Sequence, residues 1–143
     1  MKYKLYFSLA NEYENMEFWI PLMEYFLKRA DTIEIHCWNE EKEVIAEIET
    51  FLLGSFERKL DKNITIYKGP NIPDVSNYIL RKALNNEGKI KWFSIFLSKE
   101  FENVFHSEHW GKEYFAPAVN EKDIEFIKEV MPQDTNYYQY DEI

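Results

Sequence analysis

The sequence has little glycine and almost no cysteine, and both shortages exclude classes of site. Its 143 residues contain 4 Gly and 1 Cys. A single cysteine, Cys37, excludes an internal disulfide and a cysteine-based zinc cluster, and it fits a reducing compartment. The few glycines form no P-loop and no GxGxxG turn, and no nucleophile elbow or HExxH motif occurs. The sequence therefore lacks the common signatures of nucleotide binding, serine hydrolysis and zinc proteolysis.

Basic residues are also scarce relative to acidic ones. There are 17 Lys and Arg against 26 Asp and Glu, which gives a net charge of −9. This balance disfavours direct binding to nucleic acid or to an anionic membrane, because both need clustered cations. It favours a basic protein partner, although excess acid also keeps an aromatic-rich protein soluble.

Long apolar runs are absent as well. No segment approaches the length of a membrane-spanning helix, and the N-terminal stretch lacks the apolar core and small-residue cleavage site of a signal peptide. We therefore expect a cytoplasmic location.

Aromatic residues, in contrast, are abundant. They make up 17% of the chain, and apolar residues make up 45%. At this length we expect a single domain, residues 1–143, with a core of its own. So many rings in a small domain predict that some lie at the surface, where they favour contact with a partner.

Apolar runs of strand type alternate along the chain with helical patterns. This alternation predicts an α/β fold of two or three layers, with a mostly parallel sheet of four to five strands and four helices. The expected strands are Tyr3–Leu9, Thr32–Trp38, Ile64–Tyr67 and Lys89–Leu97. The expected helices run from Pro21 to Ala30, from a cap at Asn39 through Leu60, from Asp74 toward Asn86, and from a cap at Asn120 to Pro132. Residues 99–119 carry only a short expected strand near Val104, and residues 133–143 are interpreted as a polar tail.

One side of such a sheet has two interpretations. Right-handed crossovers between sequential strands would place all helices on one side. Tyr6, Trp38, Tyr67 and Phe93 would then form a partly open binding surface on the other side. Alternatively, the last helix or residues 99–119 cover that surface.

Two local clusters carry potential chemistry. His36 and Cys37 are adjacent on a strand, so their side chains point to opposite faces and cannot form a catalytic pair. Cys37 is in phase with apolar residues, which predicts a buried structural thiol. His106, Glu108 and His109 are weak candidates for metal ligands, since an HxxH spacing alone is common and a zinc site needs a further ligand.

The leading hypothesis is an acidic protein-binding domain that inhibits or regulates a basic protein partner. Exposed aromatic residues would anchor the partner, and glutamates would set the association rate. The candidate partner-binding residues are Trp38, Glu40, Glu41, Trp110, Tyr137, Tyr138 and Tyr140. In being small, acidic, aromatic-rich and without catalytic motifs, the chain is similar to immunity proteins that neutralise basic bacterial toxins and to phage-encoded inhibitors. That likeness lies in composition and assigns no residues.

The alternative is a small enzyme or a domain that binds a small ligand or metal. Its site would lie at the carboxyl ends of the strands. The side chains expected to converge there are Asn11, Glu12, His36, Asn39, Tyr67 and Ser98. We assign no catalytic residue and no cofactor from the sequence, and it does not fix the oligomeric state.

Overall fold

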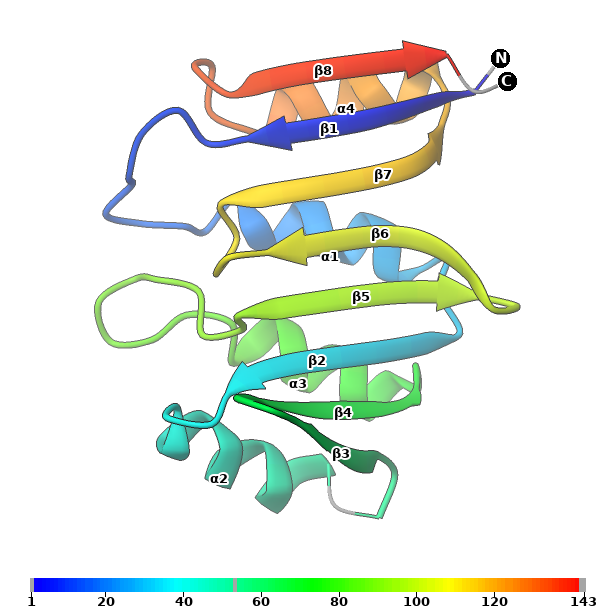
Figure 1. The fold of residues 1–143 in the computed structure, drawn as a ribbon. Coiled ribbons are helices and arrows are strands. Elements are labelled where there is room, and N and C mark those ends of the chain that lie inside the picture. The colour runs from blue at the N-terminus through cyan, green and yellow to red at the C-terminus, as the bar shows by residue number, and fades with distance from the viewer. Residues whose placement is uncertain (1, 53, 142–143) are drawn as a thin grey trace.

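The computed structural model describes residues 2–52 and 54–141, and its strands form one eight-stranded sheet (Figure 1). The strands are β1 Tyr3–Ser8, β2 Thr32–Trp38, β3 Glu57–Asp61, β4 Ile64–Pro70, β5 Ser94–Lys99, β6 Glu102–Glu108, β7 Glu113–Val119 and β8 Asn136–Asp141. The helices are α1 Trp19–Leu27, α2 Lys42–Leu52, α3 Pro73–Arg81 and α4 Glu121–Val130. Across the sheet the strand order is β3-β4-β2-β5-β6-β7-β1-β8.

The prediction of a mostly parallel sheet of four to five strands is wrong. Every neighbouring pair in the sheet is antiparallel. The expected strands exist, although the one expected over Lys89–Leu97 is β5 at Ser94–Lys99. Other strands lie between or beside them and reverse the direction of pairing. β6 and β7 separate β5 from β1, and β4 separates β2 from the edge strand β3. The sheet is therefore a set of hairpins and long connections rather than a series of parallel crossovers.

The strands that sequence reasoning missed come from three segments. Residues 99–119 form most of the β5–β6–β7 meander and not a single short strand. The expected second helix ends at Leu52, and β3 occupies the residues that follow. The segment interpreted as a polar tail contains β8, which pairs with β1 at the edge of the sheet. An edge strand exposed on one face can be this polar because little of it is buried.

The helix predictions are more accurate in position than in their ends. The last helix is confirmed, with a capping box in which Asn120 accepts from the Asp123 backbone and Asp123 accepts from the Asn120 backbone. Asn39 is not the cap of α2, because its side chain donates to the Lys62 carbonyl and accepts from the Thr65 hydroxyl. Helix α2 begins only at Lys42.

All four helices of the described residues lie on one face of the sheet (Figure 1). Helices α2 and α3 meet there through the stacked rings of Phe51 and Tyr78, whose centroids are 5.0 Å apart. The core lies between the sheet and this helical layer, and includes the stacked, nearly parallel rings of Phe26 and Phe105, whose centroids are 4.1 Å apart. In the part of the chain that is described, none of the helices has the length and apolarity needed to cross a bilayer.

Helices α1 and α4 are joined by a partly buried charged network. The Asp123 carboxylate accepts from the Arg29 guanidinium, at 3.1 Å for one of the two bonds, and from the Tyr25 hydroxyl at 2.6 Å. The Asp123 side chain is 3% exposed and that of Arg29 is 41% exposed. Burial alone would raise the pKa of Asp123, but the bonds from Arg29 and Tyr25 outweigh burial and leave this pKa below its ordinary value.

Candidate functional site

The face of the sheet opposite the helices is open. No helix of residues 2–52 and 54–141 lies over it, and Figure 1 shows all four helices on the other side. Residues 99–119 do not cover it either, because they form strands of the sheet itself. Of the two arrangements left open by the sequence, the structure shows the one with all helices on one side, although the parallel topology from which it was argued is wrong. We call this surface the open face.

A continuous series of rings crosses the open face from strand β8 to strand β2. Strand registers place these rings side by side, one from each strand. The series is Tyr140, Tyr6, Phe115, His106, Phe96 and His36, with successive centroids 6.1, 4.3, 5.6, 4.6 and 4.7 Å apart. Such cross-strand ring pairs stabilise a sheet, and here they also present a flat aromatic surface to solvent.

A hollow of about 410 Å³ lies at one end of this face, where β2 ends and β5 begins. Four of its six lining residues have aromatic rings and two have carboxylates. They are Trp38, Glu40, Glu41, Phe93, His109 and Trp110, and we call the site the aromatic–acidic hollow. Phe93 lies centrally, because its ring contacts those of Trp38 at 5.2 Å, Trp110 at 4.8 Å and His109 at 5.7 Å.

Glu41 holds two sides of the hollow together. Its Oε1 accepts from the Trp38 backbone N–H at 2.8 Å, and its Oε2 accepts from the Trp110 indole at 3.1 Å. The first bond closes the turn after β2, and the second joins that turn to the β6–β7 connection. The carboxylate is therefore fixed in orientation beside two tryptophan rings.

The β6–β7 turn adopts a backbone conformation that ordinary residues avoid. His109 and Trp110 both have left-handed φ angles, 53° and 54°, before Gly111 at 79°. Left-handed conformations are costly for residues with a Cβ atom, and they occur most often at functional sites and tight turns. Here the conformation places both rings against Phe93, so the strain coincides with construction of the hollow.

The charge around the hollow is negative and largely uncompensated. Neither Glu40 nor Glu41 forms an ion pair with any residue in the described ranges. On the adjacent strands, Glu108 and Glu113 are directly opposite each other, an arrangement that is unfavourable for like charges. His109 contacts the Glu113 carboxylate. A cation brought to this position would relieve the repulsion.

The structure brings four of the seven predicted partner-binding residues together. Trp38, Glu40, Glu41 and Trp110 all line the hollow. The remaining three lie in β8 at the far edge of the sheet, where Tyr138 and Tyr140 are exposed on the open face. Tyr137 instead points to the helical side and packs at 5.8 Å from Phe7.

Sequence reasoning missed part of the site and misplaced one ring. Phe93 was expected on the open side together with Tyr67, but Tyr67 is buried on the helical side and bonds to Glu49. Phe96, His106 and Phe115 had not been assigned to the open face. Apolar residues occupy both faces of β7, so its sequence has no polar–apolar alternation that could have identified Phe115.

Two histidines of the open face are half-buried, and burial disfavours the charged form of both rings. Burial lowers the pKa of His36, against the opposing effect of Glu34, and burial lowers the pKa of His106 as well. The Nε2 atoms of both rings are buried without a hydrogen-bond partner among the described atoms. The predicted metal candidates His106, Glu108 and His109 do not converge, and no group of three or more metal-ligating side chains occurs among the described residues.

The predicted structural role of Cys37 agrees with its position. The thiol is free and fully buried on the helical side. Burial, together with the nearby Glu41 charge, raises the pKa of Cys37 to about 12. A thiol in this environment is a packing group rather than a nucleophile.

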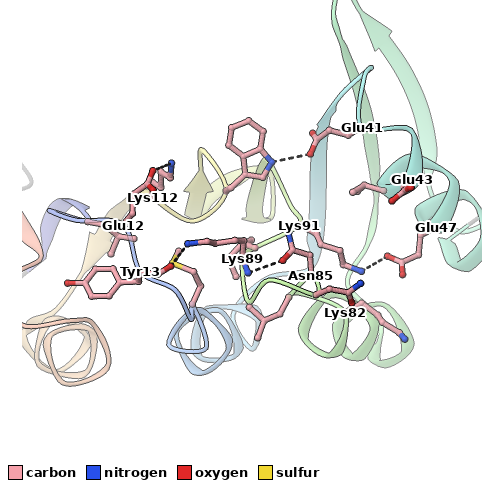
Figure 2. Close-up of a pocket in the computed structure, with 17 residues that line it drawn as sticks. Glu12, Tyr13, Glu41, Glu43, Glu47, Lys82, Asn85, Lys89, Lys91 and Lys112 are labelled. Carbon is pink, nitrogen blue, oxygen red and sulfur yellow. Dashed lines mark hydrogen bonds and ion pairs between the residues drawn. The ribbon is translucent and has the colours of Figure 1, made fainter.

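A second, larger cavity of about 760 Å³ lies on the other side of the Trp110–Glu41 bond (Figure 2). Its walls carry both signs of charge, from Glu12, Glu41, Glu43 and Glu47 and from Lys82, Lys89, Lys91 and Lys112. Several of these charges already neutralise each other, with Lys91 2.7 Å from Glu47 and Lys112 3.3 Å from Glu12. Figure 2 shows that Lys89 and Lys91 point to opposite sides of the cavity.

The residues proposed for an enzyme-like site do not meet. Neighbouring strands of an antiparallel sheet run in opposite directions, so their carboxyl ends lie at opposite ends of the strands and cannot form one site. His36 lies near the end of β2, whereas Ser98 lies opposite Thr32 at the start of that strand. Of the six predicted residues only Glu12 lines the large cavity.

Comparison of the chain with protein-family models, with curated proteins and with solved structures finds no match. The candidate site is therefore argued from its geometry.

Proposed function

We propose that this protein binds a basic protein partner through its open face, and that the aromatic–acidic hollow receives a lysine or arginine side chain of that partner. The single observation that carries the proposal is the composition of the hollow, in which three large aromatic rings and two uncompensated carboxylates surround one space. Both kinds of group attract cations, and neither attracts anions.

The expected energetics agree with recognition of a cation. An ammonium or guanidinium over a tryptophan ring gains about 0.5–2 kcal/mol, depending on how well the site excludes water. Glu41 is held in place by two hydrogen bonds, so it loses little side-chain entropy when a cation arrives. Glu40 is exposed at the rim, where a charge contributes mainly to the association rate.

The rest of the open face supplies area. The series of rings from β8 to β2 offers an apolar surface whose most exposed members are Tyr6 and Tyr140, and Tyr138 is exposed beside it. Tyrosine contributes large contact area at low entropy cost and retains a hydroxyl for hydrogen bonding. A net charge of −9 accelerates the encounter with a basic protein at low salt.

Occupying a basic surface of the partner would block whatever anionic ligand that surface binds. We therefore propose an inhibitory or regulatory role, similar in kind to that of immunity proteins. The proposal disfavours nucleic acid as the direct ligand of the open face, because phosphates would meet Glu34, Glu108 and Glu113 there.

Two experiments test the proposal. The first recovers partners of the tagged chain from its own cells at low and raised salt, beside the variant Glu40→Lys/Glu41→Lys. We expect a basic protein near stoichiometry with the natural chain, weaker recovery at raised salt, and loss with the variant. Equal recovery by both chains, or no basic protein at either salt, contradicts the proposal.

The second experiment uses a short arginine-rich peptide as the probe and a glutamate-rich peptide as its matched control. Trp19 and Trp92 are buried, so Trp38 and Trp110 are the indoles that a ligand can reach. We expect the basic peptide alone to change tryptophan fluorescence. An equal response to both peptides argues against cation recognition.

One observation favours a second candidate function. The large cavity has the size of small-molecule sites in proteins. A polar small molecule retained through purification, and lost on Lys89→Ala, would support a ligand-binding role for this cavity.

A further inference from the structure

The β5–β6 hairpin has an unusual tip. Lys99 pairs directly with Glu102, so the connection consists of only two residues, Glu100 and Phe101. Both have left-handed φ angles, 51° and 70°. Two-residue hairpins of this kind strongly favour Asn-Gly or Asp-Gly, because residues with larger side chains are strained there. The sequence therefore places glutamate and phenylalanine where the backbone favours neither.

Phe101 gains nothing for the fold from its position. Its relative exposure is 102%, whereas the other exposed large apolar side chains have values between 41% and 67%. A phenylalanine ring buried on folding is among the largest contributors to stability, but a ring fully in water contributes nothing of this kind. The tip therefore departs from two ordinary preferences, since its backbone is left-handed at residues with large side chains and its phenylalanine ring is in water. No contact inside the described part of the molecule compensates for either departure.

The tip is held in place by the neighbouring chain. The Asp31 carboxylate accepts from the Glu100 backbone N–H at 3.0 Å and from the Thr32 hydroxyl at 3.0 Å. The Asp31 backbone N–H in turn donates to the Ser98 carbonyl at 2.9 Å. These bonds fix the hairpin tip to the start of β2, so Phe101 is presented from a positioned backbone. A preorganised contact residue loses less entropy on binding than a mobile one.

We propose that Phe101 is an anchor residue that inserts into an apolar socket of the protein partner, with basic residues at the rim of that socket. The inference rests on the proposed function, since it assigns a second contact to the same partner. The rim chemistry follows from the flanking side chains, because Glu100 and Glu102 are exposed beside the ring and outnumber the single exposed cation of the tip, Lys99, which pairs with Glu102 across the strands. The same acids, together with the net charge of −9, oppose insertion into an anionic membrane.

The position of the tip defines the footprint of the partner. Phe93, at the centre of the hollow, immediately precedes β5, and Phe101 follows the strand after its last residue by two positions. Six residues of β-strand span about 20 Å, so the two contacts are separated by the length of the strand. A partner that engages both sites extends along β5. Its cationic side chain and its apolar socket must then be separated by about the length of this strand.

The test compares two variants at the tip with a matched control. Phe101→Ala removes the ring, and Glu100→Asn/Phe101→Gly removes the ring and also relieves the backbone. Phe51→Ala is the control for the Kd, because Phe51 is an exposed phenylalanine on the helical side of the sheet; its own Tm should fall, since the stack on Tyr78 is lost. The probe is the basic protein recovered with the natural chain, and the measurements are its Kd and the Tm of each variant alone.

We expect both tip variants to weaken the Kd by about 10- to 100-fold, as for an aromatic hot-spot residue, and Phe51→Ala to leave it unchanged. We also expect Glu100→Asn/Phe101→Gly to raise Tm by a few degrees while it weakens binding. An unchanged Kd for Phe101→Ala, when Glu40→Lys/Glu41→Lys still abolishes binding, overturns this inference and leaves the proposed function standing. Failure to recover any basic protein overturns both.

A second measurement identifies other occupants of the anchor. Sedimentation velocity of the chain alone would reveal self-association, and vesicles of phosphatidylserine and phosphatidylcholine would reveal lipid binding. If either interaction occurs and is lost in Phe101→Ala, the anchor serves a second copy or a membrane, and the assignment to a basic protein is overturned. We expect a monomer and no vesicle binding that depends on Phe101.

Discussion

The indole N–H of Trp110 donates a 3.1 Å hydrogen bond to the Oε2 atom of Glu41, 69 residues earlier in the chain. This bond is the partition between the aromatic–acidic hollow and the larger cavity, since both spaces are lined by the same two residues. It also fixes the charge of Glu41 at the wall of the hollow, where the proposed cation binds.

Glu41→Gln removes the charge of this residue and one of the two hydrogen bonds that it accepts. Glutamine has a single acceptor oxygen, so it can accept from the Trp110 indole or from the Trp38 backbone N–H but not from both, and we expect the fold to persist with a Tm lowered by a few degrees. Loss of the negative charge should weaken binding of the arginine-rich peptide by about 5- to 10-fold, because a charge-assisted hydrogen bond is about twice as strong as a neutral one. Isothermal titration measures this effect, with Glu43→Gln, two residues later in the first turn of α2, as the control. Equal loss in both variants would indicate a general effect of net charge.

Asp123→Asn should destabilise the protein by about 1–3 kcal/mol. The substitution removes the negative charge that pairs with Arg29 and accepts a hydrogen bond from the Tyr25 hydroxyl, while the amide can retain part of the helix cap. We expect less than the full cost of breaking a buried ion pair, since Arg29 is partly exposed and can be solvated. Urea denaturation measures the difference, and Glu125→Gln, exposed in the same helix, is the control.

The same variant has a defined pH dependence. The pKa of Asp123 is lower in the folded state than its ordinary value of 3.8, because hydrogen bonds from Arg29 and Tyr25 outweigh burial. The stabilisation is therefore fully present above pH 3.8 and is lost as the pH falls through the folded pKa. The stability difference between the natural chain and Asp123→Asn should shrink only below about pH 4. A difference that disappears already at pH 6 would assign it to another group.

His36 and His106 predict a second, milder loss of stability in acid. Burial lowers the pKa of both rings below the ordinary value of 6.5, so the unfolded chain takes up protons first as the pH falls. Stability should be constant above pH 6.5 and decrease below it until the folded rings also protonate. We expect Tm to fall by a few degrees between pH 7 and pH 5, and the fall to be smaller in His36→Phe/His106→Phe. The phenylalanine variant preserves a ring at each position, so an unchanged slope would exclude these histidines.

Cys37 should resist thiol reagents in the folded protein. Burial raises the pKa of its thiol to about 12, so almost no thiolate is present at pH 8, and the side chain is fully buried. We expect no reaction with a disulfide reagent over an hour under native conditions and complete reaction in urea. Rapid native labelling would mean that β2 opens readily.

The sequence predicted features that depend on neighbouring residues. The capping box of α4 lies within four residues, so Asn120 and Asp123 could be recognised directly. The alternation in β1 and β2 likewise identified their buried faces. Strand direction is a different kind of property, since it depends on which segments pair, and that is decided by contacts distant in sequence.

The missed strands have a specific physical cause. Hairpins are normally recognised by Asn-Gly or similar turns, but the β5–β6 turn is Glu100-Phe101 and the β6–β7 connection begins with His109-Trp110. Without turn residues the meander could not be separated into strands. The same strained turns carry the rings that we assign to binding, so one departure from local preference explains both the missed topology and the candidate site.

Four residues of the hollow could be proposed from the sequence because tryptophan and glutamate near a strand end suggest a surface anchor. Their proximity could not be predicted, since Trp38 and Trp110 are brought together only by the antiparallel arrangement of β2, β5 and β6. Phe93, which contacts both, was expected on the open side from its phase in a strand, although in the structure it lies just before β5.

The place of β1 in the sheet bears on how the protein is made. β1 is the first strand to leave the ribosome, and its two neighbours, β7 and β8, are the last. Until those strands emerge, Tyr3, Leu5 and Phe7 have no sheet to join, and an unpaired apolar strand is prone to associate with other chains. Synthesis therefore passes through a long interval in which the amino-terminal segment needs protection, and we expect soluble yield to depend on chaperones more than the final stability would suggest.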